Sequence, residues 1–123
     1  MATLADRVMD NGLSVLDTEA NVVHLTSQEA TTYAEATSTY SLGSATGISI
    51  SAPSDRAGGG RKVTLAAITN GVFNANGTAT HYAIVDTVNS RLLATDTLTA
   101  SQIVYAGNNF ALTTMDIEFT DPT

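Results

Sequence analysis

The side chains that could do chemistry in this chain are few and widely spaced. His24 and His81 are its only histidines, and it has no cysteine, so the ligand spacing of a zinc site is absent. His81 and Asp86 share one segment of small and β-branched residues, where strand alternation puts them on opposite faces. We therefore interpret His81 as a hydrogen-bonded structural histidine in preference to a metal ligand or a catalytic base.

An acidic group near the end of the chain is the second candidate. It consists of Asp116, Glu118 and Asp121. Asp116 and Glu118 share one face of a predicted strand, and the opposite face carries Met115, Ile117 and Phe119. Two such carboxylates could bind calcium, or could act as the acid and base of a hydrolase. No calcium-loop pattern accompanies them, which favours a solvated strand face.

A glycine triplet at residues 58–60 leads into Arg61, Lys62 and Val63. A phosphate-binding Walker loop needs a glycine directly before its lysine, a serine or threonine directly after it, and a helix beyond. Here Arg61 precedes the lysine, Val63 follows it, and the next residues have a strand pattern. The segment therefore indicates a flexible loop, which could contact a neighbouring protein.

Nucleophiles and aromatic residues give no stronger signal. No Gly-x-Ser-x-Gly elbow surrounds Ser41 or Ser44. Four tyrosines could stack on sugars or fill a core or an interface: Tyr33, Tyr40, Tyr82 and Tyr105. We expect the chain to be no enzyme and to use no cofactor and no metal.

Composition restricts the class of partner. Of the 123 residues 43% are hydrophobic, which is enough for a core, and only 14% are charged. Five basic residues oppose twelve acidic ones, a formal net charge of −7. Phosphates and anionic lipid surfaces would repel such a chain, so we expect no nucleic-acid or membrane partner. Other proteins remain as the expected partners.

The elements that must position these residues follow from local patterns. We predict a helix over residues 4–12, stopped by Asn11-Gly12 or continued through Leu13, Val15 and Leu16. Strands are expected at residues 22–26, 47–51, 62–69, 78–86, 91–95 and 110–120. Turns are expected at residues 70–71, 76–77, 88–90 and 107–109, and a loop at residues 53–60. Residues 27–41 match no pattern.

These elements predict a mainly β, single-domain antiparallel β-sandwich or small barrel with a short N-terminal helix. Residues 1–20 would form the helix or arm, and residues 21–123 one folding unit. Residues 78–86 would be a central strand covered on both sides. One face would carry Ala79, His81, Ala83 and Val85, and the other Thr80, Tyr82, Ile84 and Asp86.

In three places the chain resembles small tail-fibre-like or minor structural virion proteins of tailed bacteriophages. The first is the apolar helix of residues 4–12, and the second is the glycine loop and basic strand of residues 58–63. The third is the strand of residues 77–81 with the residues that follow it: Asp86, Leu92-Leu93, Leu98-Thr99, Gly107 and residues 110–119. Asn76 stands where relatives often have an aromatic residue, and residues 27–57 follow no family pattern. The resemblance implies a virion component and carries no catalytic residue over.

From this resemblance we expect a non-enzymatic virion protein made in the host cytoplasm. The acidic β-rich composition, the few charges and the separate N-terminal segment favour a role in decorating and stabilising the capsid. Its partner would be the major capsid protein or another virion protein, and it would form a homo-oligomer, with a trimer as one expected form. Contacts are expected from residues 2–16 and 52–61. The named contact residues are Leu4, Arg7, Val8, Arg56, Arg61 and Lys62. The alternatives are a tail or fibre-adaptor component and a host-receptor or glycan-binding module that uses the tyrosines.

Overall fold

The structure is a computed structural model that describes residues 6–119, apart from the side chains of residues 6–9 and 99. In this part of the chain it is mainly β, with two antiparallel sheets and an N-terminal helix, α1 (Asp6–Glu19). The larger sheet contains β1 (Val22–Thr26), β2 (Ser41–Thr46), β5 (Ile68–Phe73), β6 (Gly77–Asp86), β7 (Arg91–Val104) and β8 (Asn109–Leu112). The smaller sheet contains β3 (Ser54–Asp55), β4 (Arg61–Leu65) and β9 (Met115–Phe119).

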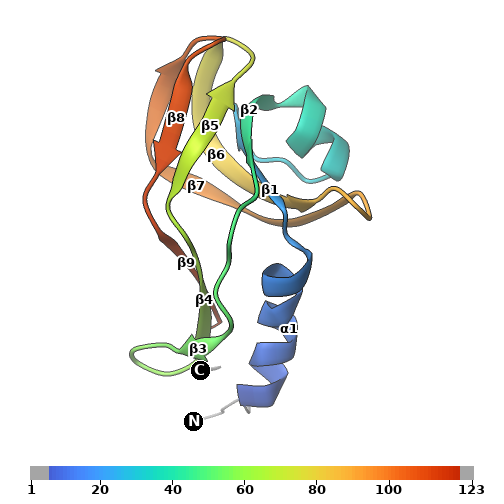
Figure 1. Ribbon diagram of the computed structural model, residues 1–123, viewed down its shortest axis with the longest axis vertical. Helices are drawn as coiled ribbons and strands as arrows, with labels where there is room; N and C mark the ends of the chain where they lie inside the picture. Colours follow the sequence, from blue (N-terminus) through green and yellow to red (C-terminus); the bar gives the residue numbers. More distant parts are fainter. Residues whose placement is uncertain (1–5, 120–123) are drawn as a thin grey trace.

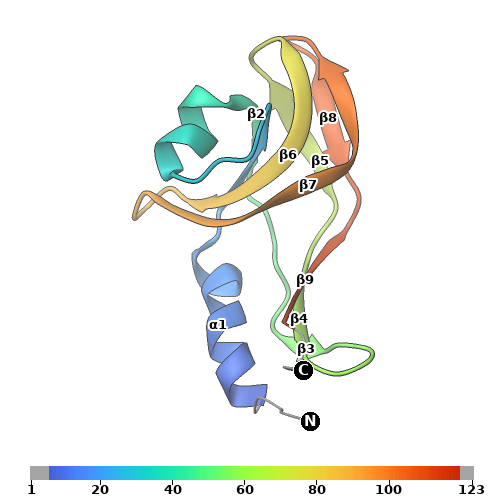
Figure 2. The ribbon, with the colours of Figure 1, turned by 180° about the vertical axis from the view of Figure 1, so that it is seen from behind.

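The two sheets and the helix form an elongated molecule. The larger sheet has the strand order β7-β6-β1-β2-β5-β8, and the smaller sheet has the order β3-β4-β9. The end strands β7 and β8 are not paired with each other within the described residues, so the larger sheet is not a closed barrel. α1 lies below the larger sheet and beside the smaller one (Figures 1 and 2). We call α1 and the smaller sheet together the stem.

One hydrophobic core joins these parts. Leu13 and Leu16 of α1 are buried in the same cluster as Val63 of β4 and Ile84 of β6. The helix is too short to be stable alone in water, so this packing is what keeps it folded. Among the described residues no helix is long and apolar enough to cross a membrane.

Of the two expectations for α1, the stop at Asn11-Gly12 is wrong and the continuation through Leu13, Val15 and Leu16 is confirmed, because the helix extends to Glu19. Gly12 lies inside the helix, where a Cβ atom would stand only 2.8 Å from the ring of Phe119 on β9. The glycine therefore allows close packing of helix against strand and does not end the helix. The capping pattern expected before Asp6 lies outside the described residues.

A long antiparallel ribbon links the two sheets. β4 leads into β5 through Ala66 and Ala67, and β8 leads into β9 through Thr113 and Thr114. β4 pairs with β9 in the stem, and β5 pairs with β8 in the larger sheet. The single strand predicted over residues 110–120 is therefore divided, because its two halves belong to different sheets.

The turn predicted at Asn70-Gly71 is wrong for a similar reason. Both residues lie within β5, and Gly71 pairs with Phe110 of β8. A Cβ atom on Gly71 would collide with the Phe110 ring, so glycine makes room for this aromatic side chain. The strand expected at residues 47–51 shows the predicted alternation, with Ile50 buried and Ser49 and Ser51 exposed, but only an isolated bridge joins Ile50 to Leu65.

β1 has the predicted bounds, and β6 is an interior strand between β7 and β1, as expected. Residues 82–86 of β6 are buried on both faces. The predicted face of Ala79 is wrong: it packs in the core cluster of Tyr82 and Ile84, whereas Ala83 and Val85 belong to a second cluster. A β-bulge explains why Ala79 lies on the other face. Residues 98–101 of β7 stand opposite Thr80 alone, and this irregularity interrupts the alternation of side chains along β6.

The segment of residues 27–41, which matched no pattern, covers the outer face of the larger sheet. It contains the short π-helix η1 (Glu35–Thr39). Ala30 and Ala36 are buried there against Val22, Ala83 and Val85. Because the alanines of the segment and of the sheet are small, the segment lies close to the sheet. One face of β6 is therefore buried under this segment, and the other face is buried in the main core.

Candidate functional site

The structure separates the residues that looked most capable of catalysis. His81 Nδ1 shares a hydrogen bond of 2.8 Å with the hydroxyl of the adjacent Thr80. Asp86 is 1% exposed and accepts hydrogen bonds from the side chain of Asn89 and from the backbone N–H groups of Val88 and Asn89. The bond from the Asn89 side chain, helped by the two N–H groups, lowers the pKa of Asp86. Asp86 thus holds the β6–β7 turn, and the interpretation that it does not work with His81 fits this geometry.

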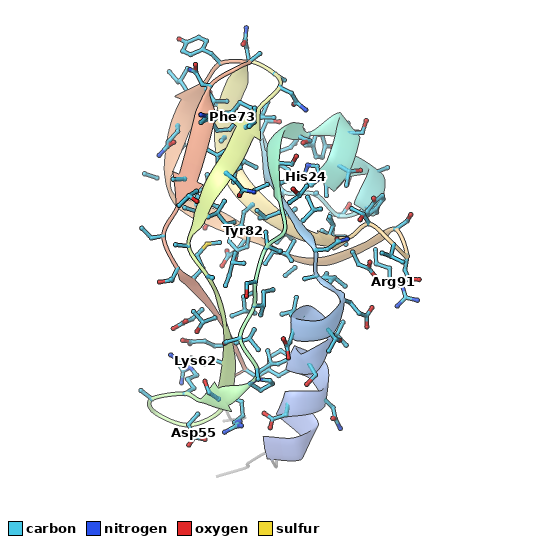
Figure 3. The ribbon with its side chains drawn as sticks, viewed as in Figure 1. His24, Asp55, Lys62, Phe73, Tyr82 and Arg91 are labelled. Carbon is cyan, nitrogen blue, oxygen red and sulfur yellow. The ribbon has the colours of Figure 1, made fainter. Side chains whose placement is uncertain are left out.

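A serine and a histidine that the sequence did not link lie together. His24 Nδ1 on β1 is 2.8 Å from the hydroxyl oxygen of Ser41 on β2. Burial lowers the pKa of His24, which favours its neutral form. Neither residue lines the cavities between β7, β8 and β9. The pair joins the neighbouring strands β1 and β2, and Figure 3 shows His24 beside the segment that contains η1.

The carboxylates of β9 lie on the outer face of the stem, as predicted. Asp116 accepts hydrogen bonds from Thr64 (2.7 Å) and Lys62 (3.2 Å) of β4, and these bonds, led by that of Thr64, lower its pKa. Glu118 forms an ion pair of 2.6 Å with Arg56. A general acid at neutral pH needs a raised pKa, so Asp116 has the opposite environment. Asp121 lies outside the described residues.

No group of three or more His, Cys, Asp or Glu side chains in the described part of the chain could hold a metal ion. The carboxylates of β9 instead face cations of the same chain. Their arrangement is that of a solvated, ion-paired strand face, which is the interpretation that the sequence favoured for Asp116 and Glu118.

The glycine triplet forms the tip of the stem. Gly58, Gly59 and Gly60 have φ angles of 89°, 105° and 95°, a left-handed conformation that favours glycine. The guanidinium of Arg56 donates hydrogen bonds to the backbone carbonyls of Ala57 and Gly59 (3.2 and 3.0 Å). The loop is therefore held in shape by Arg56, and β4 follows it where a phosphate loop would have a helix.

The three basic residues expected to contact a partner have acidic partners within this chain. Arg61 binds Asp10 of α1 (2.8 Å) and Asp55 of β3 (2.5 Å), and these bonds, that of Asp10 first, raise its pKa. Lys62 and Arg56 bind Asp116 and Glu118, as described above. Figure 3 shows Lys62 and Asp55 at the same end of the molecule. Partner contacts by these residues stay a prediction, and most of their charge is already balanced.

Arg61 was expected to be a contact residue, and sequence reasoning missed its role as a link between α1 and the smaller sheet. Arg61 pairs directly with Phe119 across β4 and β9, and both side chains reach α1, at Asp10 and at Gly12. Asp10 is 51 residues from Arg61 in the sequence, so no local spacing signals this link.

The two segments expected to contact a partner come together in the stem. α1 contains most of residues 2–16, and it packs beside β4, which follows the loop of residues 52–61 (Figure 1). Val15 of α1 and Phe119 of β9 are large apolar side chains that remain 38% and 42% exposed. Leu4 lies outside the described residues, as do the side chains of Arg7 and Val8.

The tyrosines differ in their access to solvent. Tyr82 is buried, at 7% exposed, and burial raises its pKa. Tyr33 and Tyr40 pack partly buried against the second core cluster. Tyr105, after β7, is 58% exposed and is the tyrosine best placed to meet a ligand.

Comparison with known proteins adds no relative. No protein-family model, no curated protein and no solved structure matches this chain.

Proposed function

We propose that this chain is a non-enzymatic structural protein of a tailed-bacteriophage virion, and that it decorates the capsid through its stem. The observation that carries the proposal is the meeting of α1 and the loop of residues 52–61 at one end of an elongated molecule. Both segments were expected to contact a partner, and in the folded chain one surface can use both.

The stem suits a contact based on shape and apolar area. Its cations Arg56, Arg61 and Lys62 are bound to acids of the same chain, so they would bring little net charge to an interface. Val15 of α1 and Phe119 of β9 supply exposed apolar surface on the stem. An interface above about 1,000 Å², repeated around a symmetric shell, would stabilise the capsid, and its binding would change little with salt.

A reconstruction of the particle that locates and counts this chain tests the proposal. A decoration protein is expected at every equivalent capsomer position, with the stem against the major capsid protein. Particles lacking the gene should lose heat resistance and regain it when the purified protein is added. A handful of copies at the tail would instead assign the chain to a tail or fibre-adaptor component.

Variants at the two ends of the molecule separate the stem from other surfaces. Val15→Glu should weaken binding to stripped capsids at least tenfold, because it buries a charge in an apolar contact. Ile103→Glu is the matched control, since Ile103 is 73% exposed and precedes the C-terminal end of β7, which lies at the opposite end of the molecule from the stem. Equal binding by both variants would contradict contact through the stem.

The glycan-binding alternative has one favourable observation, the exposure of Tyr105 next to Ile103, which is 73% exposed. A receptor-binding module should bind host surface polysaccharide saturably, and Tyr105→Ala should abolish that binding. Unchanged binding by this variant, or no saturable binding at all, would remove this alternative.

A further inference from the structure

A cleft runs between β7 and the segment that leads from β8 into β9. Its upper part, of about 340 Å³, lies between residues 97–102 and residues 110–115, and the buried Leu25 also lines it. Its lower part, of about 320 Å³, lies between residues 94–96 and residues 116–118. Because consecutive stretches of the same two chain segments bound both parts, we treat them as one cleft and call it the seam.

The backbone edges that border the seam have no strand partner within the described residues. β7 pairs with β6, β8 with β5, and β9 with β4, each on one side alone. Such an edge offers N–H and C=O groups to any further strand. Natural proteins usually protect exposed edges with lysine, other charges, proline or bulges. Residues 97–104 and 109–115 contain no charged residue and no proline, and the bulge at residues 98–101 interrupts the β7 edge only in that stretch.

The seam is neutral in its upper part and acidic in its lower part. Three acidic residues, Asp96, Asp116 and Glu118, are among those that line the lower part. Asp116 and Glu118 are paired with Lys62 and Arg56, whereas Asp96 forms no ion pair in the described part of the chain. The Asp96 carboxylate accepts hydrogen bonds from the backbone N–H (2.7 Å) and the hydroxyl (3.5 Å) of Thr97, both at Oδ1, and these neutral donors leave its charge available to a cation.

We propose that the seam binds an extended segment of another protein by strand addition. The segment would place small or β-branched neutral side chains in the upper part, and a lysine or arginine beside Asp96 in the lower part. Backbone hydrogen bonds to the edges of β7 or β8 would supply affinity, and the alternate side chains and the cation would supply specificity. This binding does not rest on the proposed virion function: the seam shares β9 with the stem, but its upper part is lined mainly by residues of β7, of β8 and of the segment that follows β8.

Amide hydrogen exchange of the full chain, followed by NMR, tests the proposal with defined probes. The probes are short, acetylated and amidated peptides that alternate valine with threonine and carry lysine at one end or the other. Of the two peptides, with lysine at the N-terminal or at the C-terminal end, one is expected to bind and to slow amide exchange within residues 97–102 or 110–114 at least tenfold. Replacing the lysine of that peptide with glutamate should weaken binding at least tenfold, and N-methylation of alternate bonds in the peptide should abolish binding.

Two variants and a control connect binding to the seam. Ala100→Glu puts a charge into the neutral part and should weaken binding at least tenfold, while Ala57→Glu, on the exposed glycine loop, should leave binding unchanged. Asp96→Asn should remove the preference for lysine over glutamate. Strand addition would be overturned if the N-methylated peptide bound as tightly as the unmodified peptide. It would also be overturned if the Ala100→Glu variant bound the peptide as tightly as the natural chain. Protection of the same amides by self-association without peptide would assign the seam to a second copy and would also overturn the proposal.

Discussion

Replacing Gly71 with alanine tests how closely the ribbon packs inside the larger sheet. A Cβ atom on Gly71 would collide with three atoms of the Phe110 ring. Phe110 is only 8% exposed and packs against Phe73, with ring centroids 4.9 Å apart, so its ring cannot move without disturbing the core.

Two opposing effects set the magnitude. The φ of Gly71 is outside the left-handed region, so alanine fits the backbone and would favour the strand by about 0.5–1 kcal/mol. Overpacking costs about 1–3 kcal/mol, and weakening the Phe73–Phe110 pair adds a part of its roughly 0.5–1.5 kcal/mol. We expect Gly71→Ala to lower the free energy of unfolding by about 1–2 kcal/mol and the Tm by about 4–8 °C.

Urea unfolding of a double-mutant cycle with Phe110→Leu measures the effect. The smaller leucine leaves room for the new methyl group, so the two changes together should cost at least about 1 kcal/mol less than their sum. Gly47→Ala is the control, because Gly47 has a φ of 67° and no atom within 4 Å of the added Cβ, so it should show no coupling to Phe110. An unchanged or higher stability of Gly71→Ala, or strict additivity with Phe110→Leu, would refute the reasoning.

Three further changes test the stem and the β6–β7 turn. Gly59→Ala should lower the free energy of unfolding by about 1–2 kcal/mol, measured by urea unfolding, because the φ of 105° is unfavourable for alanine; an unchanged midpoint would contradict this. Arg61→Met leaves Asp10 and Asp55 without their common cation, so amide exchange should accelerate in α1 more than in β1 and β6, and uniform rates would contradict the link. Asp86 has a pKa below its ordinary value of 3.8, so it contributes stability above about pH 4 that is lost as the pH falls through its folded-state pKa. Asp86→Asn should therefore lose less stability in acid than the natural chain in thermal unfolding from pH 6 to pH 2, and parallel curves would exclude this role.

Much of the fold can be predicted from the sequence because strand alternation is a local property. The mainly β class, the bounds of β1, the burial of β6 on both faces and the two faces of β9 all follow from neighbouring residues. The glycine loop after Pro53 follows as well, since three consecutive glycines allow the left-handed backbone that they adopt. In each case the deciding residues are only a few positions apart.

The candidate site was predicted in part. The interpretation of Asp116 and Glu118 as a solvated face fits the structure, whereas contact with a partner through residues 2–16 and 52–61 stays a prediction. The partners of Arg61 could not be predicted, because Asp10 belongs to another element far along the chain. The pair of His24 and Ser41 likewise depends on the alignment of β1 with β2.

The sequence by itself therefore determined the mainly β class, the bounds of β1 and the polar face of β9. Only the tertiary structure decided the role of the glycines and the position of the open edges. Gly12 and Gly71 have the same local signature as turn glycines, yet each makes room for a phenylalanine from a distant strand. The seam exists because β7 and β8 end the larger sheet without pairing, and strand pairing between distant segments is not encoded in any local spacing.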